Sequence, residues 1–210
     1  MFKELLTSIL ISSALSAAPL EVPEEKMPAL PNKPSPFRGK VNHSGYVGHT
    51  WVGYPHVENP ASLDMDPQGR IFVAEANRFW FGVPDLRRAR EMIREDFQAR
   101  TIEDRLAMYD KHAGKRDRAW YTQTPDRLIR LEDRDGNGVA DFRTLFSDAF
   151  KEPLDGIGFS ILAERNATYF TCIPALRKLT DPDDDGVADT NDKIVNGFGV
   201  RVSFIGHDLH

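Results

Sequence analysis

Two acidic stretches hold the residues whose types and spacing could do chemistry. The first is DRDGNGVAD at residues 133–141, and the second is DPDDDGVAD at residues 181–189, 48 positions later. In both, side-chain oxygens at positions 1, 3 and 5 can converge on one hard cation, and the glycine at position 6 permits a sharp turn. We therefore expect calcium ligands in the first loop at Asp133, Asp135, Asn137 and Asp141, and in the second loop at Asp181, Asp183, Asp185, Asp189 and Asp192.

Neither loop follows the EF-hand rule. Position 12 is Thr144 in the first loop and Asp192 in the second, and short alternating stretches typical of strands flank both loops. Asn137-Gly138 and Asp185-Gly186 also suit ordinary hairpin turns, so a turn without a cation explains the first loop equally well. The second loop has six aspartates between positions 181 and 192. They would repel at roughly 1 kcal/mol per close pair in water. This favours calcium there, bound more tightly than in the first loop.

The elements that position these loops form a repeated unit of four strands. The expected strands are 61–65, 70–75, 127–131 and 142–146 in the first unit, and 159–163, 167–172, 176–179 and 193–195 in the second. The acidic loop joins the third strand to the fourth in each unit. A repeat of 40–50 residues built from four strands is typical of a β-propeller. The sequence thus predicts an all-β fold, a partial β-propeller of about two four-stranded blades.

Residues 76–125 interrupt the first unit between its second and third strands. Leu86, Ala89, Ile93 and Phe97 recur at helical spacing, and Thr101–Asp104 resembles the cap of a second helix. We expect a helical insert in the first blade. Up-and-down connectivity places this insert and the loops between units on one face, with both acidic loops on the opposite face.

Composition and the N-terminus restrict the remaining possibilities. A net charge of −5 over 210 residues, with no basic cluster, argues against a nucleic-acid partner. Residues 1–18 resemble a signal peptide, too short to serve as a transmembrane segment, so we expect an exported protein of the periplasm or cell envelope. Residues 19–45 form a Pro-rich linker, and residues 46–210 form the propeller part. Cys172 is the sole cysteine, which excludes a disulfide framework.

Residues 61–210 resemble the start of the glucose/sorbosone dehydrogenase-like propellers, a quinoprotein group. They most resemble its membrane-bound dehydrogenase domain branch. The stretches that carry this resemblance are residues 66–75 (DPQGRIFVAE), 100–109 (RTIEDRLAMY), both acidic loops and 197–210. The resemblance implies the N-terminal portion of a six-bladed, exported enzyme that transfers hydride from a sugar or alcohol hydroxyl to pyrroloquinoline quinone (PQQ). A separate electron acceptor would serve as partner.

The resemblance also implies roles for residues near the end of the chain. His207, beside Asp208, matches the histidine that acts as base on the substrate hydroxyl, and it stands 18 residues after Asp189. The second unit likewise begins 18 residues after Asp141, so His207 falls where a third unit would begin. Arg201 could bind a carboxylate of the cofactor. Weaker candidates on the same face are Asp155, Glu75, Asn77 and Arg78.

A second function remains open at this point. Without redox chemistry, the chain would be a calcium-binding propeller module that binds a glycan or a protein. Because repeat units cannot bury their faces alone, we also expect the 210-residue chain by itself not to work as a dehydrogenase.

Overall fold

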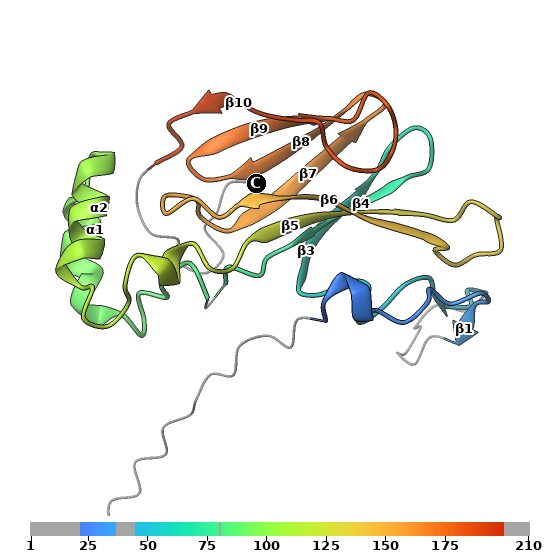
Figure 1. Cartoon of the computed structure of the whole chain (residues 1–210), viewed down its shortest axis with the longest axis horizontal. Helices are drawn as coiled ribbons and strands as arrows, with labels where there is room; N and C mark the ends of the chain where they lie inside the picture. The colour runs from blue at the N-terminus through green and yellow to red at the C-terminus, as the bar shows by residue number, and fades with distance from the viewer. Residues whose placement is uncertain (1–21, 37–44, 80, 200–210) are drawn as a thin grey trace, which may run out of the picture.

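The computed structural model describes residues 22–36, 45–79 and 81–199, and the described fold is all-β. Eight strands form two four-stranded antiparallel sheets, ordered β3-β4-β5-β6 and β10-β9-β8-β7, and β1 and β2 form a small third sheet (Figure 1). None of these sheets closes on itself. The strands are β1 Ser35–Pro36, β2 His49–Thr50, β3 Pro60–Met65, β4 Ile71–Glu75, β5 Asp126–Glu132, β6 Phe142–Phe150, β7 Gly158–Glu164, β8 Ala167–Cys172, β9 Ala175–Thr180 and β10 Thr190–Asn196.

The eight strands expected from the sequence are confirmed, and each acidic stretch joins the last two strands of its sheet. The alternation that predicted β8 and β9 is also their burial pattern, because every second side chain points into the core. β6 runs four residues further than expected, to Phe150. This extension places Phe150 against Phe170 of β8, with ring centroids 4.6 Å apart.

The two large sheets pack against each other, and β7 contacts both β3 and β4. The shared core contains Phe72, Leu128 and Phe146 from the first sheet and Phe170 and Leu179 from the second. Polar contacts add to this packing. The Ala163 amide donates to a carboxylate oxygen of Asp64 at 2.8 Å, and the Ser62 hydroxyl donates to the carbonyl of Phe159.

The other face of the first sheet is covered by the N-terminal segment, which comprises the described residues before β3 (22–36 and 45–59). Leu30, Trp51, Val52 and Val57 pack on a cluster formed by Val73, Ile129, Leu131 and Ala140. Figure 1 shows this segment, in blue, along the lower side of the sheet. Residues 22–36, expected to be a linker, therefore include a part that packs on the fold.

The segment between β4 and β5 holds two short α-helices, α1 Ile93–Gln98 and α2 Ile102–Lys111, and two 3₁₀ turns at Arg90–Met92 and Ala119–Tyr121. Thr101 caps α2 through the expected reciprocal bonds with Asp104. The expected first helix begins later than its pattern suggested. Leu86 and Ala89 lie in turns but are buried, whereas Phe97 is 63% exposed. Apolar residues at helical spacing here fill a local core that contains Ile157, the residue before β7.

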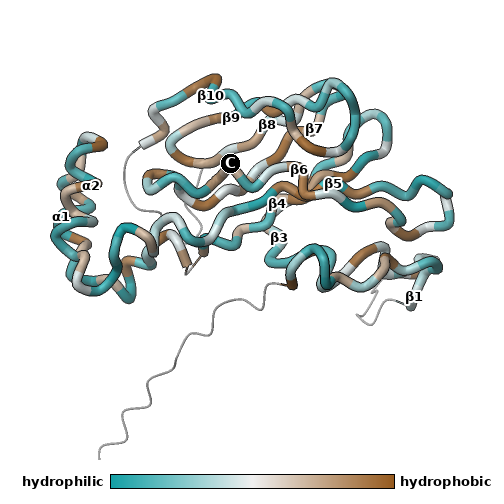
Figure 2. The backbone as a smooth tube through the Cα atoms, in the orientation of Figure 1, coloured by the Kyte–Doolittle hydropathy of each residue, from teal (hydrophilic) through white to brown (hydrophobic). Residues whose placement is uncertain are grey.

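The insert and the acidic hairpins lie at opposite ends of the sheets, as the connectivity predicted. The helices are on the left of Figure 1 and the hairpin turns on the right, and in Figure 2 the chain is largely hydrophilic at those turns. No helix in the described ranges is long and apolar enough to cross a membrane. Cys172 is a buried free thiol in the core between the sheets.

Candidate metal centre

The second acidic hairpin lies on the first sheet as well as at the end of its own sheet. The Ala188 amide donates to the carbonyl of Phe146 at 2.8 Å, and the Thr144 hydroxyl donates to the carbonyl of Gly186 at 2.6 Å. Gly186 has φ of +93°, and a Cβ there would stand 2.7 Å from the Thr144 hydroxyl oxygen. A glycine is therefore required both by its backbone conformation and by this close approach.

The first hairpin makes the equivalent contact with the N-terminal segment. The Ala140 amide donates to the carbonyl of Trp51 at 3.0 Å, and Ala140 is 48 positions before Ala188. The Asn137 side chain reaches the carbonyl of Asn32 at 3.4 Å. Each acidic hairpin therefore docks on the element that precedes its own sheet in the chain.

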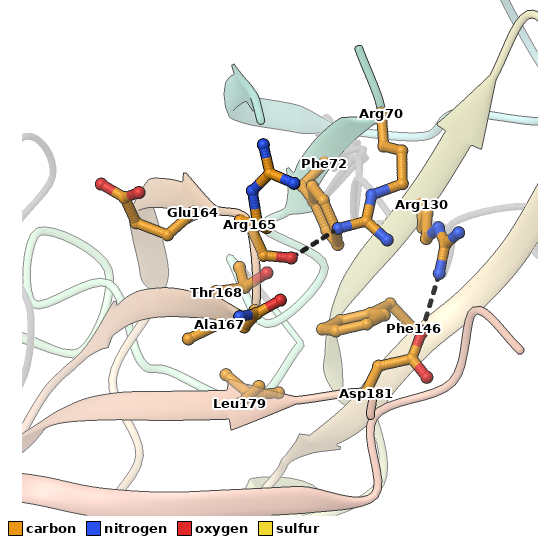
Figure 3. A pocket seen from close by; sticks show the side chains of 11 residues that line it. Arg70, Phe72, Arg130, Phe146, Glu164, Arg165, Ala167, Thr168, Leu179 and Asp181 are labelled. Carbon is orange, nitrogen blue, oxygen red and sulfur yellow. Dashed lines mark hydrogen bonds and ion pairs between the residues drawn. The ribbon is translucent and has the colours of Figure 1, made fainter. Parts of the chain in front are cut away.

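Two arginines of the first sheet join it to the second hairpin. Arg130, 1% exposed on β5, donates to the carboxylate of Asp181 at 2.8 Å and lies 2.7 Å from Asp184. Arg70 at the start of β4 donates to Asp184 at 2.5 Å and to the carbonyl of Arg165 at 2.9 Å. Figure 3 shows both arginines at the small inter-sheet pocket, with a dashed line from Arg130 to Asp181. The sequence suggested no role for either, although Arg130, between Ile129 and Leu131 in a predicted strand, was a signal for a buried ion pair.

Three predicted ligands of the second loop lie close together. Asp181, Asp183 and Asp189 each offer a carboxylate oxygen, and these oxygens lie within 4.8 Å of one another. The Asp181 side chain is 6% exposed. Its Oδ2 accepts from Arg130 and from the Gly186 amide, whereas its buried Oδ1 has no hydrogen-bond partner. Burial raises the pKa of Asp181, while the Gly186 amide and Arg130 oppose the shift.

The two remaining ligand candidates of this loop lie outside that group. Asp185 accepts from the Val187 amide at 2.8 Å, which stabilises the turn. Asp192 belongs to β10, opposite Lys178 of β9. The structure therefore gathers three of the five carboxylates that were expected to bind calcium in this hairpin.

In the first loop, hydrogen bonds within the loop already occupy the carboxylate oxygens. Asp133 accepts from the amides of Asn137 and Gly138, and Asp141 accepts from the amides of Arg134 and Asp135. Asp135 accepts from the backbone and side-chain amides of Asn137. These bonds suffice to hold a turn without a cation, which was the alternative explanation of this loop.

At the opposite strand ends, a buried polar cluster unites residues that the sequence had singled out as weak candidates. Asp126 of β5 is fully buried and accepts from the Arg78 amide at 2.7 Å and the Gly158 amide at 2.6 Å. Arg78 also donates to the carbonyl of Asp155 at 3.0 Å. Arg177 of β9 donates to the Asp155 carboxylate at 3.0 Å. The cluster ties the ends of the strands to the connection between the sheets. Asp126 and Arg177 were not foreseen, because nothing in their local sequence distinguishes them.

Glu75 and Asn77 extend this polar region. Glu75 Oε1 accepts from the Glu58 amide at 2.7 Å, while its Oε2 is buried without a partner. Burial raises the pKa of Glu75 to about 7, and it likewise raises the pKa of Asp126 to about 7 against the two amide bonds. Carboxyl groups that titrate near neutrality are common at functional sites, although structural networks produce the same shift.

The residues that the resemblance assigned to chemistry, Arg201, His207 and Asp208, lie outside the described residues. Among those that are described, Arg78 and Arg177 are the arginines of the buried cluster. Each is buried and already donates to carbonyl or carboxylate oxygens. They do not fit a role in binding the carboxylates of PQQ, so no step of a reaction is derived through that cofactor.

Comparison with known proteins gives a family without an activity. A family model described as "Domain of unknown function (DUF7133)" matches residues 42–203, a stretch that takes in both large sheets and the helical insert. No curated protein and no solved structure matches the chain. Function therefore has to be inferred from the residues themselves.

Proposed function

This chain belongs to the family described as domain of unknown function DUF7133, whose name assigns no activity, and we propose its function from its geometry. The two large sheets are consecutive blades of a β-propeller, and they form the cation-braced scaffold of an exported sugar or alcohol dehydrogenase of the quinoprotein type. On this proposal the described residues position the reacting groups rather than supply them. Those groups are His207 and Asp208, with Arg201 as the cofactor contact.

The observation that carries the proposal is the repeated docking of one sheet on the element before it. The second hairpin bonds to β6 through Ala188, and the first bonds to the N-terminal segment through Ala140, at equivalent positions. β7, the first strand of its sheet, packs beside β3, the first strand of the other. In a β-propeller the first strands of neighbouring blades also lie side by side around the axis, and this likeness supports the proposal.

The outward face of the second sheet is consistent with a further blade. Leu176 and Lys178 of β9 stand 48 positions after Leu128 and Arg130 of β5. Leu128 and Arg130 are covered by the second sheet and its hairpin, whereas Leu162, on the strand opposite Tyr169, is 53% exposed. We expect a third unit of the same kind to cover this face, with Lys178 in the role of Arg130.

A dye-linked assay tests the enzymatic part of the proposal. The full-length protein is loaded with calcium and PQQ and assayed with a panel of sugars and alcohols. We expect turnover with at least one substrate and a loss of at least a hundredfold in His207→Ala, because a positioned base contributes about 10²–10⁴-fold. His49→Ala, which changes an exposed histidine, is the control and should retain turnover. Full activity in His207→Ala would refute the assignment of the base.

The second candidate is a calcium-binding propeller module for a glycan or a protein. It is favoured by the buried cluster of Arg78, Asp126, Asp155 and Arg177, whose hydrogen bonds hold the strand ends together rather than face a substrate. Absence of turnover across the whole panel, together with saturable binding on a glycan array, would select this function over the dehydrogenase.

A further inference from the structure

We propose that the second acidic hairpin binds one calcium ion through Asp181, Asp183 and Asp189, and that the ion stabilises the seam between the two sheets, while the first hairpin binds none. This inference requires neither the dehydrogenase activity nor PQQ. The calcium site adds to the proposed scaffold function a position for the cation and the contact between sheets that the cation stabilises.

One carboxylate oxygen of Asp181 has no hydrogen-bond partner among the described residues. The Asp181 side chain is only 6% exposed, and its Oδ2 accepts hydrogen bonds from Arg130 and from the Gly186 amide. Oδ1 is buried with no partner. Leaving a buried acceptor unpaired costs about 1–3 kcal/mol, and more when the group is charged. A cation beside Asp183 and Asp189, whose oxygens lie within 4.8 Å, would satisfy that oxygen.

The two hairpins differ in the donors that reach equivalent carboxylate oxygens. In the first hairpin, Asp133 Oδ1 accepts from the Asn137 amide at 3.1 Å, and Asp141 accepts from the Arg134 amide at 2.9 Å. The equivalent of Arg134 in the second hairpin is Pro182, which has no amide proton to give to Asp189. The donor to Asp133 Oδ1 is also without a counterpart, since Asp181 Oδ1 is unpaired. The second hairpin therefore keeps the amide bonds of Gly186 and Val187 but lacks these two donors of the first.

Carboxylates outnumber the arginines that pair with them around the second hairpin. Arg130 and Arg70 are both engaged with Asp184, and Arg130 also with Asp181. Asp183, Asp185 and Asp189 form no ion pair with any residue that the structure describes. A divalent cation with oxygen ligands matches this excess of carboxylates, since calcium takes six to eight oxygens in flexible geometry. Further oxygens would come from backbone carbonyls or water.

The position of the site explains why the ion would stabilise the seam. Asp181 bonds at the same time to Arg130 of the first sheet and to the hairpin's own Gly186 amide. Gly186 and Ala188 in turn bond to Thr144 and Phe146 of β6. An ion held by Asp181 would therefore fix the hairpin in the conformation that docks on the first sheet.

Isothermal titration of the full chain with calcium chloride tests the proposal. The matched variants are Asp183→Asn and Asp135→Asn, which remove one charge at equivalent exposed positions of the two hairpins. We expect the parent to bind one calcium ion with a Kd of about 10⁻⁵–10⁻³ M. Asp183→Asn should weaken binding at least tenfold, whereas Asp135→Asn should leave both stoichiometry and Kd within twofold of the parent. Far-UV circular dichroism verifies that both variants are folded.

Each other outcome overturns the proposal. No heat of binding in the folded parent excludes the site, and two ions per chain contradict the distinction between the hairpins. Normal calcium binding in Asp183→Asn would show that Asp183 is not a ligand. Weakened binding in Asp135→Asn would show that the first loop takes part in binding. Because the titration needs neither quinone nor substrate, a failed activity assay leaves its result intact, and a failed titration leaves the assignment of His207 intact.

Discussion

At the residue scale, this protein places carboxylates in two different environments. Those of the second hairpin crowd together at its turn, and those of the opposite end are buried among backbone amides and arginines. Sequence spacing could predict the first group, because all its members lie within nine residues and follow a ligand pattern. It could not predict the second, because Asp126 and Asp155 are brought together only by the packing of the two sheets.

Glu75 gives a test of the buried group. Its folded pKa of about 7 lies above the ordinary glutamate pKa of 4.5. Its contribution to stability is therefore fully present below about pH 4.5 and is lost as the pH rises through 7. Glu75→Gln removes this ionisation, so the variant should gain melting temperature relative to the parent at pH 8 and gain less at pH 5. Thermal unfolding at both pH values provides the measurement.

The exposed Glu103→Gln serves as the control for this comparison. It should shift the melting temperature by the same small amount at both pH values, since surface substitutions away from special features are nearly neutral. A Glu75→Gln variant that loses stability more at pH 8 than at pH 5 would show that the buried carboxylate is stabilised as the anion.

At the element scale, strands and hairpins could be predicted from the sequence, and the first helix only in part. The strands follow from the alternation of side chains and from turn residues such as Asp66–Gly69, and both signals are local. The pattern that begins at Leu86 becomes helical only from Arg90, and Leu86 and Ala89 are instead buried in a cluster that contains Ile157, from beyond β6. A local sequence pattern carries no information on packing with a residue so far along the chain. The capping box of α2, in contrast, lies within four residues and was read correctly.

The docking of the hairpins can be tested with one matched pair of glycines. Gly138 and Gly186 both have positive φ, +90° and +93°. Alanine at either position should cost roughly 1–2 kcal/mol from the backbone alone. At Gly186 the added Cβ would also meet Thr144 at 2.7 Å, whereas at Gly138 the nearest atom is 3.5 Å away. Denaturant unfolding should therefore show a larger loss of stability for Gly186→Ala than for Gly138→Ala. Equal losses of stability in the two variants would mean that Gly186 is not in close contact with Thr144 of β6.

At the scale of the whole molecule, the two sheets and the N-terminal segment form a chain of docked units. Each unit covers a face of the one before it, and the hairpins and arginines lie along the seams. The sequence predicted the units from their repeat but not the seams. The partner of Arg130 is 51 residues away at Asp181, and no local signal pairs them. This is why the sequence could predict a set of candidate ligands but not their place at an interface.

The most direct test of this account is the melting temperature of the full chain measured against calcium concentration. Ligand that binds only the folded state adds RT ln(1 + [L]/Kd), about 2.7 kcal/mol at a hundredfold excess over Kd. The account predicts a rising melting temperature in the parent and in Asp135→Asn, and a flat one in Asp183→Asn. A parent whose melting temperature does not respond to calcium, or an equal rise in Asp183→Asn, would contradict a cation that braces the two sheets.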